Sequence, residues 1–321
     1  MKKIFFIIIV TFATVLSAQT EKIEYREMAS KFKDFYNSKK YDSIFLMFDD
    51  GMKKALPKEK ALSFFENNVS PAGNILEMEF TRIEQGAHVY KSTFEHMVLN
   101  IFIGLNKSNL MNGLLIKPYK AADLPKLERN STKMILPFKE EWFVFWGGED
   151  VAQNYHMANE NQQYAYDLLM VDSGSSYKGD AKKNESYFVF GKEIIAPCDA
   201  KVVKVISGVH DNVPGELNPK QLTGNTIVLE TSQKEYILFA HLKENSIIVK
   251  EGDMVKQGEV MAQCGNSGNS TEAHLHLQLQ NVPDFFQATG AKLYFDKIMV
   301  NGKLKEDYIP VKEDYIKNTN N

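Results

Sequence analysis

The chain has 321 residues, 44% of them hydrophobic and 25% charged, which are ordinary values for globular proteins, and its length allows two domains. Its formal net charge is −3 at pH 7. This mildly acidic balance argues against a nucleic-acid partner, because such proteins usually carry a basic surface.

The first residues have the pattern of a secretory signal peptide. Lys2 and Lys3 precede an apolar run over residues 4–16, and small residues follow up to Ala18. The run is shorter than the ~20 residues that a bilayer span requires, and no second long apolar run follows. We therefore predict that residues 1–18 are a signal peptide. We expect export to the periplasm, cell envelope or extracellular space, with no stable membrane span.

Residues 22–120 predict a small α+β domain. Met28, Phe32 and Tyr36 recur at four-residue steps, which is typical of one face of an amphipathic helix, and further helices are expected up to about residue 70. From residue 73 onward, apolar stretches separated by Gly and Asn turns favour antiparallel strands. Helices followed by such a sheet indicate an α+β fold.

The rest of the chain predicts an all-β domain behind a linker. Residues 121–134 are polar, contain Pro125 and lack periodicity, which indicates a linker. Residues 135–310 consist of short strands with Gly, Asn and Pro turns, typical of an all-β domain. Residues 311–321 are expected to form a frayed tail.

Two cysteines, Cys198 and Cys264, are too few for a disulfide framework. Export would permit one bridge between them. Two buried thiols are the other interpretation, because free cysteine is often buried. The sequence leaves this choice open.

The candidate chemistry lies in the β domain and begins with the stretch EAHLHLQLQ. His274 and His276 are two residues apart in an alternating run, so both imidazoles project from one face of a strand while the leucines point to the core. His241 ends another strand, YILFAHL. Asp167 lies in an apolar alternation, where a carboxylate is costly to bury unless a cation meets it. His156 precedes that strand.

These blocks resemble the LytM/lysostaphin-type zinc metalloendopeptidases, which cut peptide cross-links in bacterial cell walls. The resemblance spans about residues 136–282 and includes GKEIIAPCDAKVVKV, TGNTIVLET and IIVKEGDMVKQGEVMAQCGNSGNS as well as the histidine blocks. It implies an all-β, LytM-like metallopeptidase domain that acts on peptidoglycan peptides.

By this resemblance His156, Asp167 and His276 are the Zn²⁺ ligands, and His241 and His274 are the catalytic histidines beside the attacking water. Three protein ligands and one open position suit a hydrolytic zinc site. Which histidine acts as the general base stays open. His156 and Asp167 are eleven residues apart, whereas the commonest pattern in the family is H-x-x-x-D.

The N-terminal block MASKFKDFYNSKKYDSIFLMFDDGMKKAL resembles, more weakly, nuclear-transport-factor-like or DUF3887 domains. This implies a binding or regulatory module, and self-inhibition of the enzyme by this domain is left open. His88 and His96 are expected to be structural residues of its sheet, and His210 to lie in an exposed loop. Trp142 is expected to be structural, while Trp146 could instead line a substrate groove.

The sequence thus predicts a secreted zinc-dependent endopeptidase that hydrolyses peptide cross-links or stem peptides of peptidoglycan. The alternative is a catalytically inactive wall-binding regulator of another hydrolase. A biotinyl or lipoyl carrier domain, suggested by the hairpins around VKEGDMVKQGEV, is disfavoured because no modifiable Lys lies in an M-K-M or D-K-A context.

Overall fold

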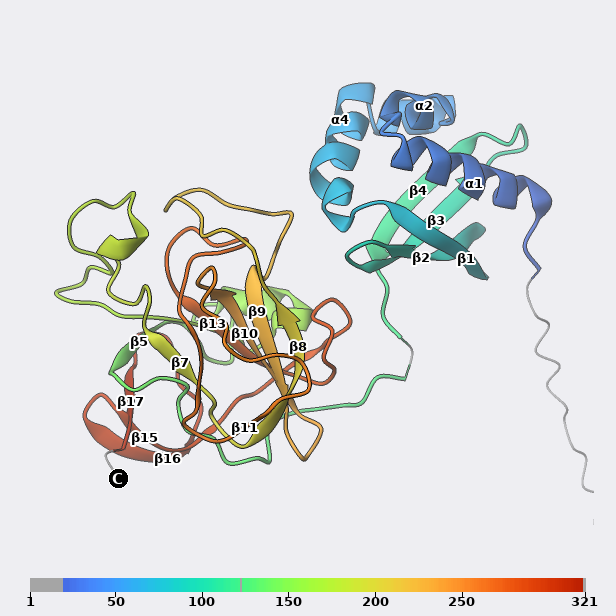
Figure 1. The fold of residues 1–321 in the computed structure, drawn as a ribbon. Coiled ribbons are helices and arrows are strands. Elements are labelled where there is room, and N and C mark those ends of the chain that lie inside the picture. Colours follow the sequence, from blue (N-terminus) through green and yellow to red (C-terminus); the bar gives the residue numbers. More distant parts are fainter. Residues whose placement is uncertain (1–19, 122, 320–321) are drawn as a thin grey trace, which may run out of the picture. The chain divides into compact units, whose positions relative to one another are not determined.

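The computed structural model describes residues 20–121 and 123–319 (Figure 1). The chain divides into two compact units. The first runs up to Glu66 and resumes over Asn74–Lys117, and the second combines Asn67–Gly73 with Pro118–Asn321. The predicted signal peptide, residues 1–18, lies outside the described residues.

The first unit is an α+β domain, as predicted. Its helical segments are α1 (Ile23–Asn37), α2 (Tyr41–Leu46), α3 (Asp50–Ala55) and α4 (Lys58–Ser63). A π-helical turn (Phe64–Val69) crosses the boundary after Glu66, and the 3-10 turn that follows (Ser70–Ala72) is assigned to the second unit. The antiparallel sheet that follows has the order β1 (Ile75–Glu84), β2 (Ala87–Phe94), β3 (Val98–Leu105) and β4 (Met111–Pro118).

Helix α1 lies across one face of this sheet (Figure 1). Its apolar stripe is buried there, including Met28, Phe32 and Tyr36. Burial of such a stripe stabilises a helix more than intrinsic helix propensity does, because short helices are marginal in water.

The second unit is almost entirely β-structure. Its strands are β5 (Trp142–Trp146), β6 (Tyr166–Leu169), β7 (Glu193–Ile195), β8 (Ala200–Ile206), β9 (Asn225–Glu230), β10 (Tyr236–Leu242), β11 (Met254–Val255), β12 (Val260–Gln263), β13 (Leu275–Gln280), β14 (Gly290–Ala291), β15 (Phe295–Val300), β16 (Lys303–Tyr308) and β17 (Tyr315–Asn318). The main sheet runs β11-β8-β9-β10-β13-β6-β5-β17-β15-β16, with β14 paired to β13, and β7 pairs with β12 in a separate two-stranded sheet.

The core of this unit receives side chains from both sheets. Leu275, Leu277 and Leu279 of β13 are fully buried in it, together with Phe239 of β10 and Ile194 of β7. The opposite face of β13 is consequently free to carry polar side chains, which is where the candidate site lies.

Residues 118–134 belong to the second unit, although 121–134 were predicted to be a linker. The buried carboxylate of Glu235 accepts hydrogen bonds from the backbone and hydroxyl of Ser131, the latter at 2.7 Å, and the Asn130 amide donates to the carbonyl of Tyr294 at 2.9 Å. Polar composition suggested a solvated segment, but these polar groups bind the domain surface instead.

The C-terminus also differs from the expected frayed tail. Strand β17 pairs with β5 and β15, and Ile316 is completely buried. The sequence of β17, Tyr-Ile-Lys-Asn, is too short to predict a strand by its own pattern. It becomes a strand because it pairs with β5 and β15, and the local composition does not indicate these partners.

In the described part of the chain, no helix has both the length and the apolarity that crossing a bilayer requires.

Candidate metal centre

Two of the predicted residues are placed by strand pairing. His276 of β13 stands opposite Asp167 of the antiparallel neighbour β6, and opposite Ala240 of β10 on its other side. Directly opposed residues point to the same face of a sheet, so the imidazole and the carboxylate meet. Nδ1 of His276 lies 3.1 Å from Oδ1 of Asp167.

His241 is placed by an irregularity in β10. The register with β9 shifts between Phe239 and Leu242, and His241 has a φ of 60°, in the left-handed region that a residue with a Cβ rarely adopts. Its backbone N–H leaves the ladder and donates to the carbonyl of Thr223 at 2.9 Å. Such bulges redirect side chains, and here the imidazole comes within 4.8 Å of the His274 ring, centroid to centroid.

His156 reaches the site through a pair of short 3-10 helices, Tyr155–Ala158 and Glu160–Gln162. Asn154 caps the first of these and donates from Nδ2 to the carbonyl of Ala165 at 2.9 Å, two residues before Asp167. This hydrogen bond folds residues 154–165 into a closed loop, which brings His156 close to Asp167 in space. The eleven-residue separation, unusual in sequence, is therefore compatible with a shared site.

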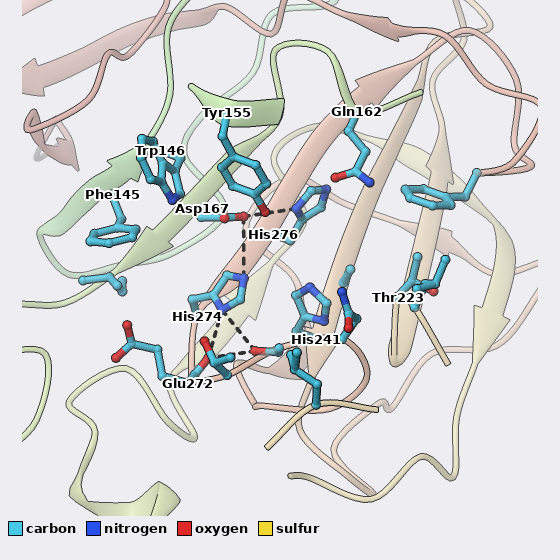
Figure 2. A pocket seen from close by; sticks show the side chains of 18 residues that line it. Phe145, Trp146, Tyr155, Gln162, Asp167, Thr223, His241, Glu272, His274 and His276 are labelled. Atoms are coloured by element: carbon cyan, nitrogen blue, oxygen red, sulfur yellow. Dashed lines mark hydrogen bonds and ion pairs between the residues drawn. The ribbon is translucent and has the colours of Figure 1, made fainter. Parts of the chain in front are cut away.

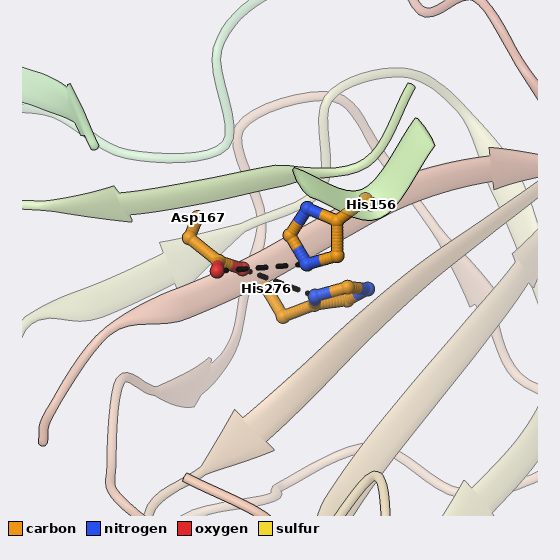
Figure 3. A group of neighbouring side chains, drawn as sticks. All are labelled: His156, Asp167 and His276. Atoms are coloured by element: carbon orange, nitrogen blue, oxygen red, sulfur yellow. Dashed lines mark hydrogen bonds and ion pairs between the residues drawn. The ribbon is translucent and has the colours of Figure 1, made fainter. Parts of the chain in front are cut away.

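The three predicted ligands converge (Figure 3). One potential ligand atom from each of His156, Asp167 and His276 lies within 4.8 Å of the others, and all three residues are buried. Nε2 of His156 is 3.5 Å from Oδ2 of Asp167 and has no hydrogen-bond partner, although it is completely buried.

These residues fit a metal ion. Nδ1 of His156 lies 2.9 Å from Oδ1 of Asn154, whose Nδ2 already donates to two carbonyls, so Nδ1 carries the proton. The bare lone pair of Nε2 then faces a carboxylate oxygen, and two acceptors at this distance repel unless a cation lies between them. Two imidazoles and one carboxylate are a normal donor set for Zn²⁺, with a position left for water.

The protonation states also suit a metal. Burial lowers the pKa of His156 to about 4, against the attraction of Asp167, so the imidazole is neutral at pH 7. Burial would raise the pKa of Asp167, but attraction to the surrounding histidines outweighs it and lowers that pKa, which keeps the carboxylate ionised. Metal binding requires neutral histidine and ionised carboxylate.

His241 and His274, the two remaining predicted site residues, both direct Nε2 toward the three converging residues. Nδ1 of His241 lies 2.8 Å from the carbonyl of Ser267, and Nδ1 of His274 lies 2.9 Å from the carbonyl of Glu272. A carbonyl only accepts, so both Nδ1 atoms carry protons, and in the neutral form of either ring Nε2 has the lone pair. Nε2 of His274 is 3.5 Å from Oδ1 of Asp167. Burial lowers the pKa of His241 well below its usual value.

A cavity of about 430 Å³ opens onto these groups. Figure 2 shows Phe145, Trp146 and Tyr155 on one side of it and Thr223 on the other, with His241 and His274 at its floor. Trp146 thus lines the cavity, while Trp142 is fully buried and stacks on Phe138 with ring centroids 4.3 Å apart. Trp146 therefore borders the cavity and Trp142 packs in the core, while a substrate contact of Trp146 stays a prediction.

All five predicted site residues are therefore brought together, and the other histidines lie elsewhere. His88 is buried in the first unit and stacks on Tyr25, whereas His96 is exposed in the turn after β2 rather than on the sheet. His210 is exposed in its loop and pairs with Glu244 at 2.7 Å. Cys198 and Cys264 are both buried and unpaired.

Several residues of the site were missed by sequence reasoning. Asn154 and Tyr155 belong to no alternating strand, and no local pattern marks them. Gln278 continues the alternation of His274 and His276, so the same period of two could have indicated a third polar residue on that face. Glu272 lines the cavity and belongs to the Gly-rich turn.

Comparisons with known proteins identify two families along the chain. Residues 187–292 match the model of Peptidase family M23, and residues 29–114 match DUF3887, a protein family of unknown function. The chain thus contains an M23 peptidase domain preceded by a DUF3887 domain, which confirms both resemblances. The M23 match covers His241, His274 and His276 but begins after His156 and Asp167. No curated protein matches.

The chain is also similar, at low sequence identity, to several solved structures. The catalytic domain of lysostaphin from Staphylococcus simulans is 21% identical, over 47% of this chain and 88% of that one, with a TM-score of 0.28. A catalytic-domain mutant of the prophage-encoded M23 protein EnpA from Enterococcus faecalis is 19% identical (38% and 92% covered, TM-score 0.25). A zinc containing peptidase from Vibrio cholerae is 13% identical (74% and 93% covered, TM-score 0.27).

Proposed function

We propose that this protein is an exported, zinc-dependent endopeptidase that hydrolyses peptide cross-links or stem peptides of bacterial peptidoglycan. One observation carries the proposal. Two histidines and an aspartate with inward-facing acceptor atoms lie beside two further histidines whose Nε2 atoms face the same cavity. The M23 peptidase domain of the chain supports the same reaction class.

His156, Asp167 and His276 would hold the zinc ion. Bound there, zinc would supply Lewis acidity and lower the pKa of a water molecule to roughly 7. Two neutral imidazoles and one ionised carboxylate would leave the centre with a net positive charge, and all three ligands are buried.

His274 is proposed as the general base. Its Nε2 lies 3.5 Å from Oδ1 of Asp167, which places its lone pair next to the ligand atoms and in reach of a water beside them. The bond from its Nδ1 to the Glu272 carbonyl holds the ring in this orientation while Nε2 accepts the proton.

His241 faces the same cavity from β10 and is proposed to act on the substrate. Its ring lies beside that of His274, with the two centroids 4.8 Å apart (Figure 2). From there Nε2 can stabilise charge on the carbonyl oxygen or transfer a proton to the departing amine. The aromatic wall of Phe145, Trp146 and Tyr155 would position an extended peptide.

The alternative function is a wall-binding regulator of another hydrolase without activity of its own. It does not require a centre that holds a metal or two histidines with free lone pairs, so zinc content and hydrolysis distinguish the two functions. Inhibition of the enzyme by its own N-terminal unit stays a prediction.

The test uses the purified chain on isolated sacculi, with mass spectrometry of the released muropeptides. We expect about one zinc per chain and soluble peptide fragments, which also identify the bond that is cleaved. His276→Ala should abolish release, and His210→Ala, an exposed histidine in the same unit, should leave it unchanged. Absence of zinc together with full activity of His276→Ala would refute the proposal, and binding without hydrolysis would favour the regulator.

A further inference from the structure

Each histidine of the candidate metal centre is bonded, on its outward nitrogen, to a buried carboxamide. Asn154 contacts His156 and Gln278 contacts His276, and both carboxamides are completely buried. A buried carboxamide is costly unless all its groups are bonded, so its partners reveal its orientation.

The orientation of Gln278 is set by a chain of bonds along β13. Its Nε2 donates to the carbonyl of Asn161 at 3.0 Å and to Oε1 of Gln280 at 2.6 Å, and Nε2 of Gln280 donates to the carbonyl of Val282 at 2.7 Å. The two backbone carbonyls can only accept hydrogen bonds. Reversing either amide would therefore place oxygen against oxygen.

Oε1 of Gln278 must consequently be the atom that faces His276, at 2.9 Å from Nε2. An oxygen there requires a proton on Nε2. In the neutral ring, which metal binding requires, Nδ1 of His276 then keeps its lone pair, 3.1 Å from Oδ1 of Asp167.

Asn154 imposes the opposite arrangement on His156. Its Nδ2 donates to the carbonyls of Gly148 and Ala165, at 3.2 and 2.9 Å, which leaves Oδ1 as the acceptor for Nδ1 of His156. The proton is held on Nδ1, and Nε2 carries the lone pair.

We propose that Asn154 and Gln278 are positioning residues that hold the two histidines in opposite tautomers, so that Nε2 of His156 and Nδ1 of His276 point together at the metal. Gln280 does not contact a histidine itself. It accepts a hydrogen bond from Nε2 of Gln278 and so prevents the Gln278 carboxamide from flipping its oxygen and nitrogen. This inference rests on the proposed zinc site for its effect on metal affinity, but the tautomers themselves are a property of the metal-free chain.

Loss of Gln278 would remove the acceptor for the Nε2 proton. Asp167 is then the strongest acceptor near His276, and a proton on Nδ1 would be bonded to it, which blocks the lone pair that the metal needs. Partners of metal-binding histidines contribute about 10–100-fold to metal affinity.

The experiment uses the full chain with Gln278→Met and Gln280→Met, which keep side-chain length and remove the amide. Asn130→Leu is the matched control. Asn130 is also a buried carboxamide bonded to backbone carbonyls, at 2.9 Å from Thr132 and Tyr294, but it touches no ligand. Zinc affinity is measured by competition with a chelator, and the tautomers of His156 and His276 by ¹⁵N shifts of the metal-free imidazoles.

We expect Gln278→Met to weaken zinc binding by about 10–100-fold and Gln280→Met by less, with His276 shifting toward the Nδ1-protonated tautomer in both. Asn130→Leu should leave affinity and tautomers unchanged. Unchanged affinity and tautomer in Gln278→Met would overturn the inference, as would an equal loss in Asn130→Leu. If the wild type binds no zinc while its tautomers still respond to Gln278→Met, the positioning role stands and the proposed function fails.

Discussion

His276 and Asp167 face each other across the paired strands β13 and β6, with Nδ1 and Oδ1 3.1 Å apart and both side chains buried. The two residues are 109 positions apart in the chain. Antiparallel register alone brings them together, and the two strands of the pair are held from both sides by β10 and β5. The centre is therefore built on rigid elements, with only His156 supplied by a loop.

Replacing Asp167 with asparagine should remove the anionic ligand at nearly constant volume. We expect zinc affinity to fall by more than about 100-fold, beyond the range for residues that only support a ligand, because the charge that attracts the cation is lost. Chelator competition measures this. Asp172→Asn, an exposed acid in the same segment, is the control, and equal affinities of the two variants would contradict the ligand role.

His274→Ala should separate metal binding from catalysis. Its ring is not among the three converging ligands, so zinc content should stay at the wild-type level while the rate of muropeptide release falls by about 10²–10⁴-fold, the contribution typical of a general base. Zinc content and the rate of muropeptide release, measured on the same preparation of the variant, test this prediction. Loss of zinc in parallel with activity would instead make His274 a ligand.

The metal-free protein should lose stability as the pH is lowered from about 6.5 toward 4. The folded-state pKa of His156 is lowered by burial to about 4, whereas an unfolded histidine titrates near 6.5, so the unfolded chain binds more protons between these values. The stability contributed by the neutral imidazole is present above about pH 6.5 and is lost as pH falls toward 4, by up to about 3 kcal/mol.

Urea unfolding in the presence of a chelator, repeated between pH 4 and 7.5, measures this loss. His241 should contribute in the same direction, because burial lowers its pKa as well. A His156→Gln variant should show a shallower dependence on pH in this window. A dependence equal to that of the wild type would show that other groups cause the loss.

The two tryptophans should respond differently to alanine substitution. Trp142 is fully buried and stacked on Phe138, so its replacement should cost about 3–5 kcal/mol of unfolding free energy. Trp146 lines the cavity, with Nζ of Lys312 4.1 Å from its ring centroid, so its replacement should cost about 1 kcal/mol and mainly raise KM. Urea unfolding and peptide-release kinetics test the pair, and a large stability loss in Trp146→Ala would contradict the assignment to the groove.

The parts of the fold that follow from periodicity were predictable. Met28, Phe32 and Tyr36 indicated the buried face of α1, and the leucines of β13 indicated which face of that strand meets the core. The linker and the tail were not, because residues 118–134 and β17 are held by partners distant in sequence, such as Glu235 and β5. Local composition carries no information about such partners.

The sequence by itself indicated which side chains could share a site: His274 directly precedes β13 and is two residues from His276, and side chains two apart along an extended chain point to one face. It also determined that Asp167, buried in an apolar alternation, needs a cation. Only the tertiary structure decided which lone pairs converge. That choice depends on strand register between β6 and β13, on the bulge that turns His241, and on carboxamides fixed by backbone carbonyls. The pairing of β6 with β13 and the bond from Gln278 to Asn161 join segments more than 100 residues apart, whereas the bulge and the bond from Asn154 to Ala165 are local but follow no sequence period.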